Sequence, residues 1–275
     1  MKWVVCFVLA TLLTLLAHVR TDGFSPSVCQ QVVGEQTEST THVSWPLRFT
    51  YLARGKQAFV FVSEDQKYVL KLFDRTHLQV PWFAKMFGLF KNRKRRGAQR
   101  QQIFPESYRL AFDSVREETG LLCVHMGRSS TLWPTIELID KASRHFHVNL
   151  NEVAFVVQKK GEGTLLDKLF EVKNDVPVLK QCLEQYLSLH AKRMHHHIAD
   201  YDRDIRHNYA WGESGLMYID PARFFFEPLL HEPARLKHEW WGCTYRLRKW
   251  LVKNAPEVLE WYDEKVNQAS SATDR

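Results

Sequence analysis

The sequence predicts an α+β protein in which an antiparallel sheet with one or two helices precedes a short, mostly helical part. Three short runs of β-type residues, separated by turn residues, follow one another early in the chain. Apolar residues at helical spacing dominate much of the second half. With 275 residues, 45% of them hydrophobic, the chain is long enough to bury a core as one ordinary domain or two small ones.

Residues 1–23 have the pattern of a targeting segment. Lys2 precedes an uncharged, mainly apolar run from Trp3 to Ala17, and Arg20 follows it. A charge followed by such a run is typical of a secretory signal peptide or of an uncleaved signal anchor. The alternative is a hydrophobic helix packed within the fold. We therefore expect export, or attachment to a membrane through this segment.

The sheet is expected to begin after a polar linker over residues 24–45. Three β-type runs are separated by two turns rich in Gly, Lys, Asp and Gln. The short connections predict three consecutive antiparallel strands, the start of a sheet-containing part over residues 46–158. These runs cover residues 47–53, 58–63 and 68–73.

A basic insert over residues 75–105 interrupts this part. It has eight Lys or Arg and no acid, and without those eight charges the formal net charge of +7 falls to −1. A nearly neutral remainder argues against a nucleic-acid partner. Between residues 80 and 100, aromatic and Met side chains recur at helical spacing beside the basic run. They would lie on an anionic membrane surface or in a partner's groove, or else pack on the sheet with the basic residues solvated.

The rest of the sheet-containing part is expected to contain one helix and a second group of strands, and the remainder of the chain is expected to be helical. A helix from about Glu106 to Glu118 is expected to end at Gly120. A helical part over residues 159–275 is expected to contain a helix at 177–193 and a Trp-rich helical tail interrupted near Pro256. Before it, a second group of strands is predicted at residues 121–126, 135–140, 145–149 and 153–158.

The stretch from Asp200 to Arg223 carries the clearest chemical signal. Asp200, Asp202 and a third aspartate precede Asn208, and Asp220 ends a short apolar run twelve residues later. Phosphoryl-transfer sites use one carboxylate to orient or deprotonate the acceptor, and an amide and a second carboxylate to hold Mg²⁺. We expect Asp202 to take the first role, with Asp200 as the second candidate, and Asn208 and Asp220 to bind the metal. The alternative is an acidic, solvated loop.

Lys71 is the corresponding candidate in the sheet. It is the one charged residue in the apolar run of residues 68–73, and a lysine on a third strand can reach the α- and β-phosphates of ATP. The alternative is a lysine at a strand edge that points into water. Gly55 lies in the preceding turn, where a phosphate-covering loop would be, and Glu106 is the first choice for a carboxylate partner of Lys71.

Other groups of potential ligands do not have metal-site spacing. None of the five cysteines has a partner at the separation that zinc sites use. His195, His196 and His197 are adjacent, and neighbours on a helix point about 100° apart, so they cannot all face one ion. We interpret them as the end of a helix entering a loop.

The chain resembles the protein-kinase-like fold, and in particular small kinase-like proteins of chlamydia-type intracellular bacteria. The resemblance covers roughly residues 47–230 and implies an amino-terminal lobe built on a sheet, a reduced carboxy-terminal lobe, and ATP with Mg²⁺ as cofactors. The residues that carry it are the run 68–73 with Lys71, the aromatic and basic insert, Ser107–Phe112, Glu117–Leu121, Ala154–Lys160, the Asp200-x-Asp202-x-Asp204 pattern before Asn208, and Ile219–Phe224.

The sequence departs from the kinase pattern at several points. Kinase catalytic loops usually place the acceptor-binding Asp five residues before the Asn, a position held here by Arg203, whereas Asp202 is six before Asn208. The turn at Gly55 has a single glycine. The expected function is therefore an ATP- and Mg²⁺-dependent phosphotransferase of unknown acceptor; the alternatives are an inactive, pseudokinase-type binding module and a membrane-surface adaptor.

Overall fold

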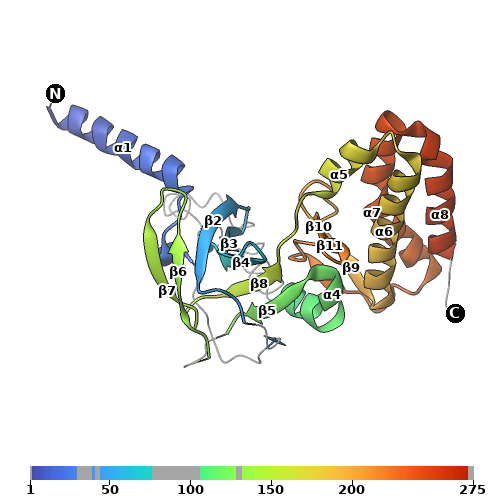
Figure 1. Cartoon of the computed structure of the whole chain (residues 1–275), viewed down its shortest axis with the longest axis horizontal. Helices are drawn as coiled ribbons and strands as arrows, with labels where there is room; N and C mark the ends of the chain where they lie inside the picture. The colour runs from blue at the N-terminus through green and yellow to red at the C-terminus, as the bar shows by residue number, and fades with distance from the viewer. Residues whose placement is uncertain (1, 30–38, 41–43, 76–105, 128–131, 272–275) are drawn as a thin grey trace, which may run out of the picture. The chain divides into compact units, whose positions relative to one another are not determined.

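The computed structural model describes the chain except for residues 1, 30–38, 41–43, 76–105, 128–131 and 272–275 (Figure 1). The fold is α+β, as predicted. The chain forms two compact units. The first comprises residues 1–98 and 122–158, and the second comprises residues 99–121 and 159–275. The basic insert expected to contact a membrane, residues 80–100, lies outside the described residues.

Three consecutive antiparallel strands form the centre of the first unit. They are β2 (Arg48–Arg54), β3 (Ala58–Ser63) and β4 (Tyr68–Phe73), which confirms the prediction. In the register of β3 with β4, Val60 lies opposite Lys71. Alternating apolar residues place Phe59 and Phe61 in the core, since side chains two apart on a strand share a face.

The complete sheet has eight strands in the order β1-β5-β8-β4-β3-β2-β6-β7. Because β6 pairs with β2 in parallel, the sheet is mixed, and the prediction of a purely antiparallel sheet is wrong. The direction of β6 is set by how the chain returns to the far edge of the sheet, which local sequence does not reveal. The added strands are β1 (Ser39–Thr40), β5 (Leu121–His125), β6 (Thr135–Ile139), β7 (His145–Asn149) and β8 (Phe155–Lys159).

The segment before the sheet is part of the first unit's core. Phe24 is buried and makes edge-to-face contacts with Phe59, Phe61 and Phe146. The preceding carboxylate, Asp22, accepts hydrogen bonds from Tyr51 at 2.6 Å and Lys141 at 3.0 Å. Cys29, after the short helix η1 (Pro26–Val28), is also buried. Residues 22–29 therefore pack on the sheet, although the sequence suggested a linker from residue 24.

Helix α1 (Lys2–Thr21) occupies the segment expected to target the protein. Many of its apolar side chains are exposed, among them Trp3, Phe7, Leu13 and Val19. Within the described residues, none of the helices combines the length and the apolar character that crossing a membrane requires. Export or anchoring stays a prediction.

The second unit is mainly helical, with short strands between its helices. A helix over residues 106–114 and α4 (Arg116–Thr119) are followed by Gly120 in the left-handed conformation, φ 62°, as expected for a glycine that ends a helix. Helices α6, α7 and α8 contact one another (Figure 1). The larger helices are α5 (Leu165–Val172), α6 (Val176–His195), α7 (Pro233–Asn254) and α8 (Leu259–Ser271), and η3 (Pro256–Val258) joins the last two.

Helix α6 and the tail confirm the sequence prediction, including the interruption at Pro256. Helix α6 ends at His195, so the three adjacent histidines do mark a helix end. The sequence did not predict α5 or most of the short strands. The short strands of this unit are β9 (Ile198–Asp200), β10 (Tyr209–Gly212), β11 (Gly215–Tyr218) and β12 (Phe224–Phe226), of which β11 corresponds to the short apolar run before Asp220.

Candidate functional site

Four short strands position the stretch from Asp200 to Arg223 in the second unit. Strand β9 pairs antiparallel with β12, and Asp200 lies opposite Phe224. Strands β10 and β11 form a hairpin in which Tyr209 lies opposite Tyr218. The acidic residues therefore occupy two adjacent connections. One runs from β9 to β10 and carries Asp202 and Asn208, and the other runs from β11 to β12 and carries Asp220.

Asn208 joins these two connections. Its side-chain Nδ2 donates a hydrogen bond to the backbone carbonyl of Asp202 at 3.0 Å. Its own backbone carbonyl accepts a hydrogen bond from Ile219 N at 2.8 Å, which extends the β10–β11 pairing by one residue. Asp220 follows immediately after Ile219. The three residues predicted to act together, Asp202, Asn208 and Asp220, are thus held within one local arrangement.

The candidate metal ligands keep oxygens available. Oδ1 of Asp220 accepts hydrogen bonds from Ala222 N at 3.3 Å and from the Tyr108 hydroxyl at 3.4 Å. Within the described residues, Oδ2 of Asp220 and Oδ1 of Asn208 make no hydrogen bond. Neither oxygen is among the buried polar atoms that lack a partner. Since Mg²⁺ prefers oxygen ligands and keeps several waters or phosphate oxygens besides, an amide and a carboxylate in this arrangement fit it.

Asp202 faces solvent. Its side chain is 41% exposed, and its Oδ2 lies 4.0 Å from Nε of Arg223. Its backbone N–H donates to Oδ1 of Asp200 at 2.8 Å, a turn in which an aspartate caps the residue two positions later. The loop conformation therefore fixes the backbone of Asp202 and leaves its carboxylate accessible to solvent.

Asp200 differs from Asp202 although the two are only two residues apart. It is 5% exposed, and burial raises its pKa to about 7, against the lowering effect of the Arg193 charge. One of its oxygens already accepts the Asp202 N–H. The second catalytic candidate is thus placed where it supports the loop from inside the unit.

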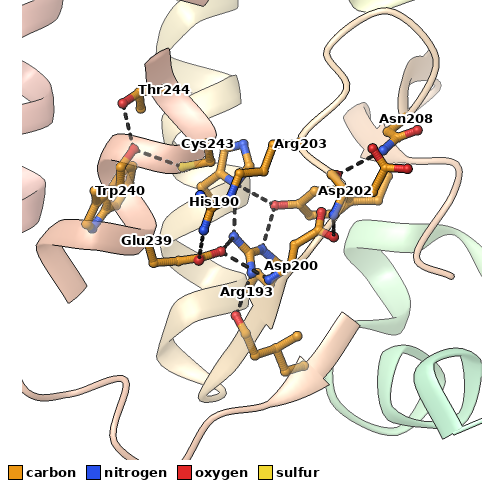
Figure 2. A network of polar contacts seen from close by, with 12 residues as sticks. His190, Arg193, Asp200, Asp202, Arg203, Asn208, Glu239, Trp240, Cys243 and Thr244 are labelled. Atoms are coloured by element: carbon orange, nitrogen blue, oxygen red, sulfur yellow. Dashed lines mark hydrogen bonds and ion pairs between the residues drawn. The ribbon is translucent and has the colours of Figure 1, made fainter. Parts of the chain in front are cut away.

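A buried ionic network holds the loop to two helices (Figure 2). Glu239 on α7 accepts hydrogen bonds from Arg193 on α6 at 2.7 Å and from Arg203 in the loop at 2.6 Å. It also accepts one from the backbone N–H of Asp200 at 3.1 Å. Burial raises the pKa of Glu239, but the two guanidinium groups outweigh it, so the pKa is lowered overall and the group stays ionised. One carboxylate therefore fixes the loop between α6 and α7.

Arg193 is the most buried member of this network. Its Nη1 donates to the Ile198 carbonyl at 2.6 Å and its Nε to the Tyr218 hydroxyl at 3.2 Å. The Tyr218 hydroxyl also lies 2.9 Å from Nδ1 of His190. Burial and the Arg193 charge lower the pKa of His190 well below its usual value. A neutral His190 beside a charged Arg193 links α6 to β9 and β11, which carry the loop.

Arg203, five residues before Asn208, packs against α7. Its guanidinium lies against α7, where Gly242 leaves room for it: a Cβ at that position would overlap the guanidinium. Arg203 is therefore directed toward Glu239. The Asn208 side chain instead donates a hydrogen bond to the backbone of Asp202, the residue before Arg203. Arg203 thus packs among the helices, whereas the side chain of the preceding Asp202 is 41% exposed.

Lys71 and Gly55 belong to the first unit, and Glu106 belongs to the second. Lys71 is buried on β4 in the first unit. Gly55 is exposed in the turn between β2 and β3, where its N–H donates to the Ala58 carbonyl at 2.9 Å, and a Cβ there would meet only that carbonyl at 3.6 Å. The turn therefore has no steric need for glycine. Glu106 is exposed at the start of the helix over residues 106–114 in the second unit.

The sequence analysis missed Arg193, Glu239 and His190. A usable signal was present for one of them: Glu239 is the sole acid in the α7 sequence and sits beside Trp240, at a spacing that places it on the buried face. Arg193 and His190 lie on α6 at positions three apart, but several other charged residues of that helix are exposed, so periodicity alone does not single them out.

The described residues contain no ready-made group of metal ligands, and the comparisons with known proteins that were searched give no match. In the described part of the chain, no group of three or more His, Cys, Asp or Glu side chains is arranged to hold a metal ion. Neither a protein-family model nor a curated protein matches this chain.

Proposed function

We propose that the protein is a kinase-like phosphotransferase that uses ATP and Mg²⁺ and acts on an acceptor still to be identified. The observation that carries the proposal is the arrangement of Asn208 between Asp202 and Asp220. An accessible carboxylate, an amide and a second carboxylate on adjacent connections are the groups that phosphoryl transfer requires from the protein.

The first unit supports the same proposal. In protein kinases the phosphate-binding lysine lies on the third strand of the amino-terminal sheet. Lys71 lies on β4, the third of the three consecutive antiparallel strands β2, β3 and β4. A helix over residues 106–114 follows in sequence, before the next long strand β5, as the kinase-like order of elements requires.

The residues would divide the work as follows. Asn208 Oδ1 and Asp220 would hold the Mg²⁺ ion, which when bound neutralises charge on the phosphates. Asp202 accepts a hydrogen bond from the acceptor hydroxyl and takes its proton as the acceptor oxygen bonds to the γ-phosphorus. The bond between that phosphorus and the β–γ bridging oxygen breaks, and ADP leaves. Lys71 pairs with the phosphates of ATP.

Nucleotide binding is the first property to test. ATP with Mg²⁺ should raise the thermal unfolding midpoint of the full chain, because a ligand that binds only the folded state stabilises it. Asp220→Ala and Asn208→Ala should remove most of that shift, and Lys71→Met should weaken it. The matched control is Asp113→Ala, an exposed carboxylate on the helix over residues 106–114, which should retain the shift. No shift in the wild-type chain at millimolar ATP would contradict the proposal.

Transfer is tested separately from binding. Asp202→Asn should keep the ATP-dependent shift and lower ADP formation by about 100-fold or more, since a positioned general base contributes about 10²–10⁴-fold. Coupled detection of ADP with candidate acceptor pools measures this loss.

A second candidate is a nucleotide-binding module without transfer activity. The observation that favours it is the turn of Arg203 into α7, which leaves the usual acceptor-binding register without a carboxylate. This alternative would be supported by a wild-type chain that binds ATP and Mg²⁺ but, with every acceptor tested, forms ADP no faster than Asp202→Asn does.

A further inference from the structure

Helix α7 carries an exposed ridge of aromatic and basic side chains on the side opposite Glu239. Trp241, Tyr245 and Val252 are 59%, 48% and 51% exposed, although large apolar side chains of this kind are usually buried. His238, Trp241, Tyr245, Lys249 and Val252 are three or four positions apart, so they form one line along the helix. We call these five residues the α7 ridge.

The unpaired charges of α7 have one sign. The single acid of α7, Glu239, is buried in the network with Arg193 and Arg203. Of the six Lys and Arg of this helix, Arg235, Arg246 and Arg248 pair with Glu227, Asp204 and Asp263. In the part of the chain that the structure describes, Lys237, Lys249 and Lys253 form no ion pair with an acid and are exposed. The ridge therefore offers apolar rings flanked by three uncompensated positive charges.

We propose that the α7 ridge binds an anionic lipid membrane surface. Trp and Tyr favour the boundary between headgroups and hydrocarbon because their rings are apolar and carry one polar atom. Lysine side chains beside them can extend their ammonium groups to the lipid phosphates while their carbon chains stay on the apolar side. Val252, an aliphatic residue in the same line, fits hydrocarbon.

The ring geometry favours lipid over single-stranded nucleic acid as the occupant. Trp241 and Tyr245 pack on one another with centroids 5.2 Å apart and planes 34° apart, and His238 stacks on Trp241 at 6.3 Å. Because the rings contact one another along the helix, part of the area on which bases would stack is already used. Their edges and the lysines remain exposed.

Helix α1 sets the design of the test. Its exposed apolar side chains would bind neutral and anionic vesicles alike, so binding alone says little about α7. The full chain should be floated with vesicles of phosphatidylcholine and with vesicles containing about a third phosphatidylglycerol, and the ratio of the two partition coefficients compared. Lys249 and the lysines that flank the ridge affect this ratio, whereas the apolar contribution of α1 cancels from it.

Lys249→Glu/Lys253→Glu should lower the anionic-to-neutral ratio by about tenfold or more, since each lysine near an anionic surface contributes a factor of about five. The matched control, Lys67→Glu/Lys173→Glu, makes the same change in net charge on β3–β4 and after α5 and should leave the ratio within about twofold. Equal losses in both variants would mean that net charge alone acts, and would overturn the proposal.

A second measurement locates the contact and does not depend on a charge reversal. Brominated phosphatidylglycerol should quench the fluorescence of the wild-type chain more than that of Trp241→Phe, a substitution that retains an exposed ring. Equal quenching would overturn the proposal. So would a ratio unchanged in Lys249→Glu/Lys253→Glu together with loss of RNA binding or of self-association, each of which would assign the ridge to another occupant. None of these measurements depends on ATP.

Discussion

Asp200 and Asp202 show how strongly the environment of one residue can differ from that of its near neighbour. Asp200 is buried, close to Arg193 and Glu239, and its pKa is raised to about 7. The Asp202 side chain is 41% exposed. Since both carboxyl groups have the same intrinsic chemistry, the difference comes from α6 and α7, whose side chains enclose one of them. In this site, solvent accessibility separates an exposed carboxylate from a buried one that supports the loop.

The raised pKa of Asp200 predicts a pH-dependent stability. Its folded pKa of about 7 lies above the unfolded value of 3.8, so the folded state binds more protons between these values and its stability falls as pH rises through them. Asp200→Asn keeps an oxygen for the Asp202 N–H but does not titrate. The free energy of unfolding of this variant, relative to the wild type, should therefore be higher at pH 8 than at pH 5. Urea unfolding at both pH values measures the difference.

The comparison with the variant isolates Asp200 from His190. His190 has a lowered pKa, so its own contribution has the opposite sign and is lost as pH falls. It is present in both proteins and cancels in the difference. A relative stability of Asp200→Asn that is the same at both pH values would show that the buried carboxyl does not titrate as described.

At the scale of secondary-structure elements, α7 decides where the loop lies. Glu239 bonds to Arg193, Arg203 and the Asp200 backbone, and Gly242 makes the space in which the Arg203 guanidinium rests. Truncating one partner of such a buried pair is costly because the other charge stays buried. The loop conformation is therefore a property of its packing on α7 as well as of its own sequence.

Gly242→Ala should disturb the site without adding any polar group. The new methyl would displace the Arg203 guanidinium and weaken its bond to Glu239, with an expected loss of about 1–3 kcal/mol in the free energy of unfolding. The control is Gly163→Ala, since a Cβ at Gly163 meets nothing within 4 Å and should change stability by less than about 0.5 kcal/mol. Equal stability of the two variants in urea unfolding would show that Arg203 relocates at no cost.

Across the whole molecule, the two units differ in what lies at their centres: an apolar core in the first and a buried ion pair in the second. The first is organised around Phe59, Phe61 and the residues packed on them, including Phe24 from before the sheet. The second is organised around Arg193 and Glu239. The packed part of the first unit thus begins by Asp22, directly after α1.

Phe24→Ala should therefore destabilise the first unit by about 3–5 kcal/mol, as expected for truncating a buried phenylalanine. Phe7→Ala on α1 is the matched control, because that ring is 75% exposed and its loss should cost less than about 0.5 kcal/mol. Denaturant unfolding of the two full-length variants provides the comparison, and similar stabilities would mean that residues 22–29 contribute little to the fold.

Local patterns were sufficient where partners are close in sequence. The bounds of β3 and β4 agree with the prediction because tight turns join adjacent strands, and α6 agrees because its apolar face repeats over many turns. Strands β9 and β12 could not be found in this way. Each has three residues, too few to show a period, and each is stabilised by pairing with a strand more than twenty residues away.

Local sequence alone was enough to predict the α+β class, the three-stranded start of the sheet with Lys71 on its third strand, and the acidic and amide residues grouped between Asp200 and Asp220, because all of these depend on neighbouring residues. The tertiary structure decided three further matters: the parallel pairing of β6 with β2, the burial of Asp200 against the exposure of Asp202, and the turn of Arg203 toward Glu239. Each depends on groups brought together from distant parts of the chain, whose contacts and loss of solvent exist only after folding.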